Sequence, residues 1–337
     1  MVALAFAGAG FVTAIHGLAA DALPDLRVVH VASRSTRSAR RRAAQTGGIA
    51  CGYDELPGGA DVVVVATPPA LHRREAERAV GGAAVALVEA PLAATLDDAD
   101  RLVAAARGGR VGYAENLVHS PAVVESLGAR KRLGSLTHLE VRFAQGRPDW
   151  GDHLAPSWGG GALFDLGAHA VTLALLAAAP ARVTAVEAQL VAGAGLELDD
   201  DATVTLVFDS GLRAEVRATW RAPAPTWEAQ AAGPTGAVRL ELVPHPSVEL
   251  NGAPVVLPAP PAGLASPQLH QLGYVAQLEA LTADIDAGRA PTPGPQLGRH
   301  VLDIVCAAYA SARTGREEQV PFTGRRDRTP LQLWRGD

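Results

Sequence analysis

Near its N-terminus the chain reads Val2-Ala3-Leu4-Ala5-Phe6-Ala7-Gly8-Ala9-Gly10-Phe11-Val12-Thr13. The apolar run before Gly8 predicts a buried parallel strand, and the residues after Gly10 predict a helix. Gly8 permits a tight turn, and Gly10 lets a pyrophosphate approach the helix N-terminus, where Phe11 and Val12 present N–H groups. The third glycine of a full dinucleotide fingerprint is missing, so an ordinary strand-to-helix turn is the alternative interpretation.

Beyond this stretch, short apolar runs alternate with helical patterns as far as about residue 115. We expect strands at residues 2–7, 27–32, 61–66, 84–89 and 110–114. We expect helices between them at residues 11–20, 37–46, 71–80 and 96–106. Repeated strand–helix units of this kind predict an α/β Rossmann domain with a doubly wound parallel sheet, which we place at residues 1–118.

The pattern changes in the rest of the chain. Strands are expected at residues 136–143, 183–191, 203–208, 212–219, 237–242 and 247–250, and helices at residues 162–178, 269–287 and 297–314. Short connections such as Asp209-Ser210-Gly211 join consecutive strands. They predict a mainly antiparallel sheet, and therefore an α+β second domain at residues 119–337.

Composition excludes several classes of protein. The formal net charge of -5 gives no general attraction to nucleic acid or to an anionic membrane, and no apolar run is long enough to span a bilayer. Cys51 and Cys306 form no CxxC pair, and the ten histidines show no metal-ligand spacing. We therefore expect a cytoplasmic protein that acts on a small molecule and uses no metal ion.

The end of the second expected strand selects the cofactor. A chain that binds NAD places Asp or Glu there to accept the ribose hydroxyls, but no carboxylate lies between Asp25 and Asp54. Ser33 and Arg34 can instead hold a 2′-phosphate by charge-assisted hydrogen bonds, with Arg37 nearby. This favours NADP(H) over NAD(H). The alternative is a solvated basic loop.

Six motifs follow one another along the chain. They are Gly8-Ala9-Gly10 with His16, Ala66-Thr67-Pro68-Pro69 with His72, Val88-Glu89-Ala90-Pro91-Leu92-Ala93, Glu115-Asn116 with Pro121-Ala122, the run from Gly159 to His169, and the run from Ala307 to Gly315. In this order they resemble the Gfo/Idh/MocA oxidoreductases, the family of glucose–fructose oxidoreductase and inositol dehydrogenase. The resemblance covers nearly the whole chain.

The resemblance implies a large open sheet in the second domain and a homodimer or homotetramer built through that sheet. It implies hydride transfer between a nicotinamide cofactor and a carbon that bears oxygen on a sugar or cyclitol. It also places further residues beside the cofactor, namely Thr67, Pro68, His72, Glu89, Ala90 and Asn116.

Asp165 and His169 are the expected catalytic pair. Their spacing of four residues puts both on one face of a helix, and imidazole suits proton transfer near neutral pH. Without the resemblance, a buried structural histidine and a surface carboxylate would be the preferred interpretation. We expect substrate contacts from three further side chains: Glu115, His153 and Trp158.

Ala90 departs from the resembled family, which has a lysine at this position of its E-K-P-L-A motif. Alanine can neither stabilise charge on the reacting oxygen nor donate a proton. Either His169 transfers the proton alone, or another group substitutes, or the bond that is reduced is C=N or C=C. A non-redox lyase, isomerase or cyclase, or a protein that only senses NADP(H), is the alternative.

Overall fold

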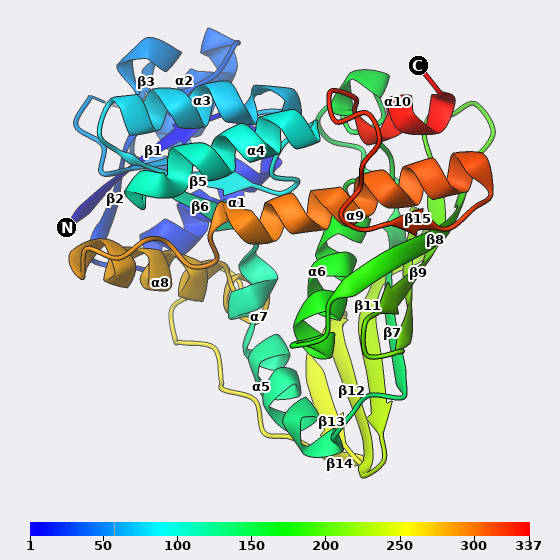
Figure 1. Cartoon of the computed structure of the whole chain (residues 1–337). Coiled ribbons are helices and arrows are strands. Elements are labelled where there is room, and N and C mark those ends of the chain that lie inside the picture. Colours follow the sequence, from blue (N-terminus) through cyan, green and yellow to red (C-terminus); the bar gives the residue numbers. More distant parts are fainter. Residues whose placement is uncertain (57) are drawn as a thin grey trace. The chain divides into compact units, whose positions relative to one another are not determined.

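The computed structural model describes residues 1–56 and 58–337 (Figure 1). For Arg107 this description covers the backbone and not the side chain. The chain forms two compact units. The first unit comprises Met1–Ala93, Asp97–His119 and Pro260–Arg299. The second unit comprises Ala94–Leu96, Ser120–Ala259 and His300–Asp337.

A six-stranded parallel sheet forms the centre of the first unit, in the order β3-β2-β1-β4-β5-β6. Its strands are β1 Val2–Ala7, β2 Leu26–Ala32, β3 Ile49–Cys51, β4 Val62–Val65, β5 Val85–Glu89 and β6 Val111–Ala114. Chain order reverses between β1 and β4, which makes the carboxyl ends of these two strands the switch point where such sheets bind ligands. The expected doubly wound parallel sheet is confirmed.

The helices that connect these strands follow the expected order. They are α1 Phe11–Asp21, α2 Thr36–Thr46, α3 Pro69–Gly81 and α4 Leu96–Ala105, with the short helices η1 Tyr53–Glu55, η2 Ala106–Gly108 and η3 Asn116–His119. Residues of α1 and α2 pack with the strands in one hydrophobic core. Within residues 1–56 and 58–337, no helix is long and apolar enough to cross a membrane.

The segment Pro260–Arg299 belongs to the first unit, whereas the sequence led us to expect it in the second domain. Leu269, Val275 and Leu278 share a hydrophobic core with Leu4 and Phe6 of β1. Burial of these apolar side chains returns the chain to the Rossmann sheet after the second unit is complete. The single helix expected at residues 269–287 is two helices, α7 Gln268–Gln271 and α8 Tyr274–Asp286.

A nine-stranded sheet forms the centre of the second unit, in the order β14-β13-β12-β11-β7-β10-β9-β8-β15. Its strands are β7 His138–Gly146, β8 Val183–Val191, β9 Asp201–Phe208, β10 Arg213–Thr219, β11 Arg221–Gly233, β12 Gly236–Val243, β13 Ser247–Leu250, β14 Ala253–Pro254 and β15 Glu318–Gln319. The mainly antiparallel arrangement is confirmed, although β7 and β10 pair in parallel.

Helices cover one face of this sheet. These helices include α5 Pro121–Arg130 and α6 Leu166–Ala178. The other helices of this part of the chain are α9 Pro295–Thr314, α10 Pro330–Arg335, η4 Lys131–Leu133 and η5 Pro156–Trp158. Side chains of α5 and α6 meet Leu139, Ala229 and Leu240 on the covered face. The side chains of the opposite face are polar or charged, which is the alternation expected of an antiparallel sheet with one solvated face.

Strand β11 was not expected, although it is the longest strand of the sheet and lies near its middle. Its first half carries Pro223 and Pro225, which lack the N–H group that a central strand uses. The structure accommodates them where the pairing with β7 shifts register between Arg221 and Thr226. Regular pairing resumes at Thr226, after the prolines.

Candidate functional site

The glycine turn after β1 has the geometry that a dinucleotide requires. Gly8 has φ +122°, and a Cβ atom there would lie 2.2 Å from the carbonyl oxygen of Ala66, so only glycine fits between the ends of β1 and β4. Gly10 is the N-cap of α1 and supplies no side-chain cap, and the first turn of α1 holds no acidic residue. The helix N-terminus therefore suits an anion such as a pyrophosphate.

Arg42 braces this turn, a role that the sequence did not indicate. Its Nη2 donates to the carbonyl oxygen of Gly10 at 2.8 Å, and its Nη1 donates to Oε1 of Gln45 at 2.8 Å. Burial, with a smaller effect from the charge of Arg41, lowers the pKa of Arg42. The buried face of α2 also includes Ala39 and Ala43, at helical spacing. That spacing was the available signal for a buried arginine.

The end of β2 presents a polar and basic surface. Ser33 is half-buried, whereas Arg34 and Arg37 are exposed. Burial raises the pKa of Tyr53, and the charge of Arg34 and a hydrogen bond from its backbone act in the opposite direction. Arg34 therefore lies against η1 while its side chain remains exposed. The three residues that we expect to bind a 2′-phosphate therefore follow the carboxyl end of β2.

His72 ties two loops of the site together. The ring is buried, its Nε2 lies 2.6 Å from the carbonyl oxygen of Thr67, and its Nδ1 lies 3.0 Å from that of Pro91. Burial lowers the pKa of His72. The histidine thus fixes the Thr67–Pro68 loop against the cis Ala90–Pro91 turn. Thr67 Oγ1 is buried without a hydrogen-bond partner among the described residues, which leaves it available to a ligand.

Glu89 is buried beside Ala90. Its Oε1 lies 2.5 Å from Nε2 of His16, and its Oε2 accepts a hydrogen bond from the backbone N–H of Ala90 at 3.2 Å. The sequence placed Glu89 at the cofactor and assigned no role to His16. The structure makes the two a buried pair that joins α1 to the end of β5.

The two expected residues that follow β6 are also buried. Asn116 Nδ2 donates to the carbonyl oxygen of Leu272 at 2.7 Å and so holds the returning segment on the first unit. Glu115 has no exposed surface. Burial raises the pKa of Tyr113 and Tyr274, and the charge of Glu115 adds to that effect. The substrate contact expected of Glu115 would require this part of the site to open.

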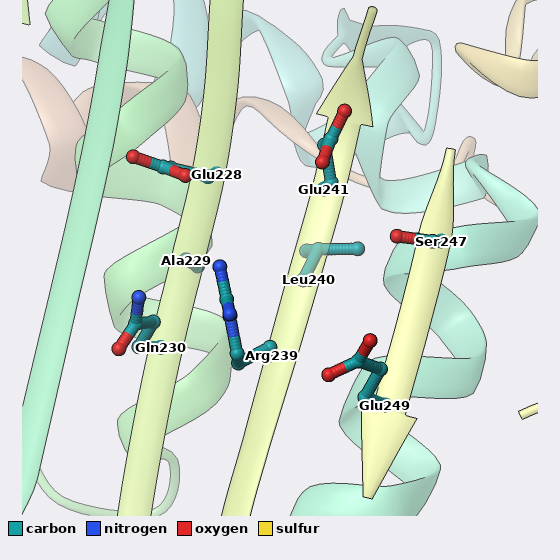
Figure 2. Close-up of a pocket in the computed structure, with 8 residues that line it drawn as sticks. All are labelled: Glu228, Ala229, Gln230, Arg239, Leu240, Glu241, Ser247 and Glu249. Atoms are coloured by element: carbon teal, nitrogen blue, oxygen red, sulfur yellow. The ribbon is translucent and has the colours of Figure 1, made fainter. Parts of the chain in front are cut away.

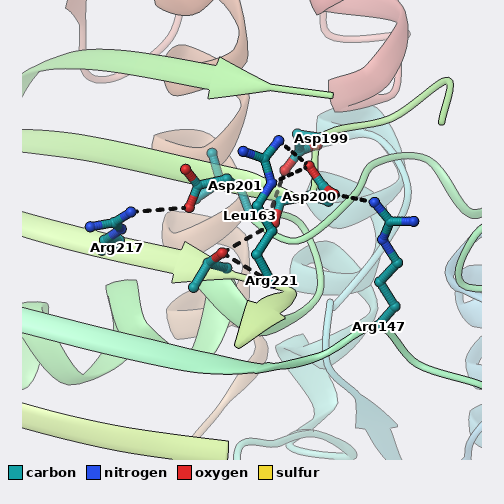
Figure 3. A network of polar contacts seen from close by, with 8 residues as sticks. Arg147, Leu163, Asp199, Asp200, Asp201, Arg217 and Arg221 are labelled. Atoms are coloured by element: carbon teal, nitrogen blue, oxygen red, sulfur yellow. Dashed lines mark hydrogen bonds and ion pairs between the residues drawn. The ribbon is translucent and has the colours of Figure 1, made fainter. Parts of the chain in front are cut away.

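In the second unit, Asp199 shapes the glycine-rich turn before α6 (Figure 3). Its carboxylate accepts hydrogen bonds from the N–H of Gly161 at 3.0 Å, the N–H of Leu163 at 2.8 Å and the hydroxyl of Tyr309 at 2.5 Å. A Cβ atom at position 161 would lie 1.9 Å from the carbonyl oxygen of Asp199, so glycine is required there. The turn delays the start of α6 from the expected residue 162 to Leu166.

Asp200, the next residue, carries a buried ion-pair network (Figure 3). Arg147 Nη2 and Arg221 Nη2 each lie 2.6 Å from one of its carboxylate oxygens. Burial alone would raise the pKa of Asp200, but hydrogen bonds and charge from the two arginines outweigh it and lower the pKa. Asp201 pairs with Arg217 at 3.5 Å. The sequence shows three consecutive aspartates but not their partners, which lie far from them in the chain.

Four of the expected site residues meet in the second unit. Asp165 is the N-cap of α6, and His169 follows one turn later. His153 Nε2 lies 3.6 Å from Asp165 Oδ1, and the His153 ring packs on Trp158 with a centroid distance of 4.0 Å. Burial raises the pKa of Asp165, and the charges of His153 and His169 act against that rise.

The described part of the chain contains no group of three His, Cys, Asp or Glu side chains placed to hold a metal ion. Asp165, His153 and His169 are titratable side chains of a kind that can transfer protons, and the helix N-terminus at the glycine turn suits an anion.

Comparison with known families matches both halves of the chain. Residues 2–116 match the model of an oxidoreductase family with an NAD-binding Rossmann fold, and residues 123–239 match the model of the GFO/IDH/MocA C-terminal domain. Comparison with curated proteins gives no match.

Solved structures share the whole fold. GenD2 from gentamicin A biosynthesis, in complex with NAD, is 27% identical, with a TM-score of 0.83 over 95% of this chain and 96% of that one. An aldose–aldose oxidoreductase from Caulobacter crescentus, complexed with glycerol, is 23% identical, with a TM-score of 0.80 over 95% and 100%. A putative myo-inositol dehydrogenase from Sinorhizobium meliloti 1021 is 19% identical, with a TM-score of 0.81 over 95% and 100%.

Replacement of Asp199 by Asn should loosen the turn before α6. The amide nitrogen would face an N–H or O–H donor, and each lost bond to the carboxylate should lower the free energy of unfolding by about 1.5–3 kcal/mol. Amide hydrogen exchange at Gly161 and Leu163 should accelerate. Asp209→Asn, in an exposed turn, is the matched control and should leave both amides unchanged. Equal exchange rates in both variants would contradict the role given to Asp199.

Proposed function

The chain belongs to the Gfo/Idh/MocA family of oxidoreductases, and on this premise we propose that it is an NADP(H)-dependent oxidoreductase. It transfers a hydride to or from a sugar-like, cyclitol or secondary-metabolite substrate, at a C=O bond or at a C=N or C=C bond. The observation that carries the proposal is the Gly8–Gly10 turn, which opens α1 at the switch point of the parallel sheet.

The residues of the first unit fit a dinucleotide. The uncapped N-terminus of α1 suits the pyrophosphate, and the unpartnered hydroxyl of Thr67 lies in the loop after β4. Gly8, Gly10, Phe11 and Val12 supply the backbone of the phosphate site. When bound, a nicotinamide cofactor supplies a carbon that accepts or gives a hydride.

The choice of NADP(H) rests on charge at the end of β2. GenD2 was crystallised with NAD. In this chain, Ser33, Arg34 and Arg37 lie where a chain selective for NAD carries a carboxylate, and the two arginines are exposed. A 2′-phosphate gains charge-assisted hydrogen bonds from such a surface, whereas a ribose diol finds no anionic acceptor there.

Proton transfer is assigned to His169. Oxidation of an alcohol releases the hydroxyl proton, and a half-buried imidazole one turn into α6 can accept it. Asp165 lies one turn earlier on α6, and the charge of His169 acts to lower the pKa of Asp165. The sugar-like substrate is supported by the names of similar structures, which include an aldose–aldose oxidoreductase and a putative myo-inositol dehydrogenase.

A second candidate function follows from Ala90. Position 90 supplies no proton and no positive charge, so the scaffold also suits a non-redox lyase, isomerase or cyclase, or a protein that senses NADP(H). The Asp165 and His169 pair favours an enzyme over a sensor, since a sensor needs no acid or base.

A homodimer or homotetramer through the open face of the nine-stranded sheet is also proposed, because the charges on that face are self-complementary. One row across the strands reads Arg217, Arg142, Glu228 and Glu241, so it is positive on β10 and β7 and negative on β11 and β12. Figure 2 shows the two glutamates of this row. The next row reads Glu215, Glu140, Gln230 and Arg239, which reverses the signs at its ends.

A two-fold axis that runs parallel to the strands, over the boundary between β7 and β11, places opposite charges face to face. Arg142 then meets Glu228 of the partner subunit, and Arg217 meets Glu241 of the partner subunit. Such an isologous contact uses the same patch on both copies, as a closed dimer requires. Complementary charge of this kind fixes the register of the two sheets.

The cofactor proposal predicts that NADPH binds and that Arg34→Ala weakens this binding. Loss of a charge-assisted bond to the 2′-phosphate should raise the Kd for NADPH on the order of 10-fold to 100-fold and leave the Kd for NADH unchanged. Titration calorimetry measures both constants. Arg40→Ala, an exposed arginine on α2, is the matched control. Absence of binding at millimolar NADPH would refute the proposal.

The catalytic proposal predicts that His169→Ala lowers kcat by roughly 10²–10⁴-fold with little change in NADPH affinity, because the variant removes the proton acceptor and not the cofactor site. The assay follows absorbance at the nicotinamide band with carbonyl, imine and enone substrates. Product that forms without any absorbance change would favour the non-redox alternative.

The assembly proposal predicts that Arg142→Glu dissociates the oligomer, since like charges would then face each other twice across the two-fold axis. The double variant Arg142→Glu, Glu228→Arg restores opposite charges and should reassemble. Sedimentation velocity measures the oligomeric state, with Arg101→Glu on an exposed part of α4 as the control. A wild-type monomer at micromolar concentration would exclude this interface.

A further inference from the structure

Resting on the proposed function, we propose that the His153–Asp165 ion pair passes protons between His169 and solvent. His153 thereby adds a second imidazole beside Asp165. The alanine at position 90 of this chain cannot transfer a proton itself. His153 acts through Asp165, so it is a positioning residue in the reaction. The proposal depends on three observations in the second unit: the protonation of the His153 ring, its fixed position and the double use of Asp165.

The hydrogen bonds of His153 define which nitrogen carries a proton. Nδ1 lies 3.0 Å from the backbone carbonyl oxygen of Trp150, which can only accept, so Nδ1 holds a hydrogen. Nε2 lies 3.6 Å from Asp165 Oδ1. A neutral ring protonated at Nδ1 would turn a lone pair toward an ionised carboxylate, and the two would repel. A further proton on Nε2 or on the carboxyl group would make this contact attractive, and the proposed relay uses that proton.

The ring is held in place from two sides. Trp158 lies against it at a centroid distance of 4.0 Å, and Trp150 meets it edge-on at 6.2 Å. The side chain of His153 remains 15% exposed and that of Asp165 remains 23% exposed. A ring that is fixed by packing yet touches water can exchange its proton with solvent without leaving its partner.

Asp165 interacts with two imidazoles at once. His153 approaches from the loop before η5, and His169 lies on the same helix, four residues later. Burial raises the pKa of Asp165, and the charges of these two histidines act against that rise. The only other titratable group beside His153 in the sequence is Asp152, which is exposed.

The transfer balances as one proton in and one proton out. In the oxidation direction, His169 takes the proton of the substrate hydroxyl and passes one proton to Asp165. Asp165 passes one proton to Nε2 of His153, which releases one proton to water. In the reduction direction every transfer reverses. No bond other than those to hydrogen changes within the relay.

The first test measures the ring itself and needs no substrate. Long-range ¹H–¹⁵N spectra of the full-length wild-type protein report which nitrogen of each histidine is protonated, and His153→Gln identifies the signal of residue 153. The proposal requires Nδ1 of His153 to be protonated at every pH examined. A neutral ring protonated at Nε2 alone would overturn it, whether or not the protein proves to be a reductase.

The second test is the pH profile of kcat for His153→Gln. The glutamine keeps hydrogen bonding but removes a group that holds the pKa of Asp165 down, so that pKa rises and activity is lost at a higher pH on the acid side. We also expect a fall in kcat on the order of 10-fold at neutral pH, with KM nearly constant. His245→Gln, in an exposed turn, is the matched control.

Chemical rescue separates a proton relay from simple packing. Added imidazole should restore activity to His153→Ala and leave His169→Ala inactive, because the second variant lacks the first proton acceptor. A His153→Gln profile identical to that of the wild type, together with no rescue of His153→Ala, would refute the relay. Absence of nicotinamide-linked turnover in the wild type would instead refute the proposed function, and the spectra would still decide the state of His153.

Discussion

The close approach of Gly8 to the carbonyl oxygen of Ala66 is the constraint on which the first unit depends. No side chain fits there, and the left-handed conformation at Gly8 turns the chain directly from β1 into α1. The helix N-terminus consequently points at the switch point of the sheet. Arg42 fixes the next part of the turn through the carbonyl of Gly10, and His72 fixes the loop after β4. These hydrogen bonds hold the turn and the loop that form the proposed phosphate site.

The sequence predicted the regular elements well because their signals are local. Buried parallel strands such as β4 appear as apolar runs, and the antiparallel strands as alternating patterns. It could not predict that Pro260–Arg299 returns to the first unit, nor that Asp199 and Tyr309 meet across 110 positions. Such pairings depend on the folded chain. Asp165, His169, His153 and Trp158 do lie in one unit, but only the structure joins His153 to Asp165.

Two buried carboxylates, Asp199 and Asp200, lie between the strands β8 and β9, outside any helix or strand. The buried carboxylate of Asp199 accepts hydrogen bonds from three groups around the glycine-rich turn: the N–H of Gly161, the N–H of Leu163 and the hydroxyl of Tyr309. Asp200 is buried beside two arginines, and only removal of both would leave its charge uncompensated. The Asp199 network holds the turn that fixes the position at which α6 begins.

That fixed start explains how a chain with alanine at position 90 can still handle protons. Asp165 is the N-cap of α6, so its carboxylate is positioned by the same turn that Asp199 holds. A lysine on a flexible stem would bring one mobile charge, whereas His153 and His169 bring two imidazoles to a carboxylate that cannot move far. An imidazole that exchanges protons near neutral pH must alternate between proton donor and proton acceptor. Its efficiency in proton transfer therefore depends more on fixed geometry than on a permanent charge. In the proposed relay, alanine at position 90 therefore changes how the proton travels without removing acid–base chemistry from the site.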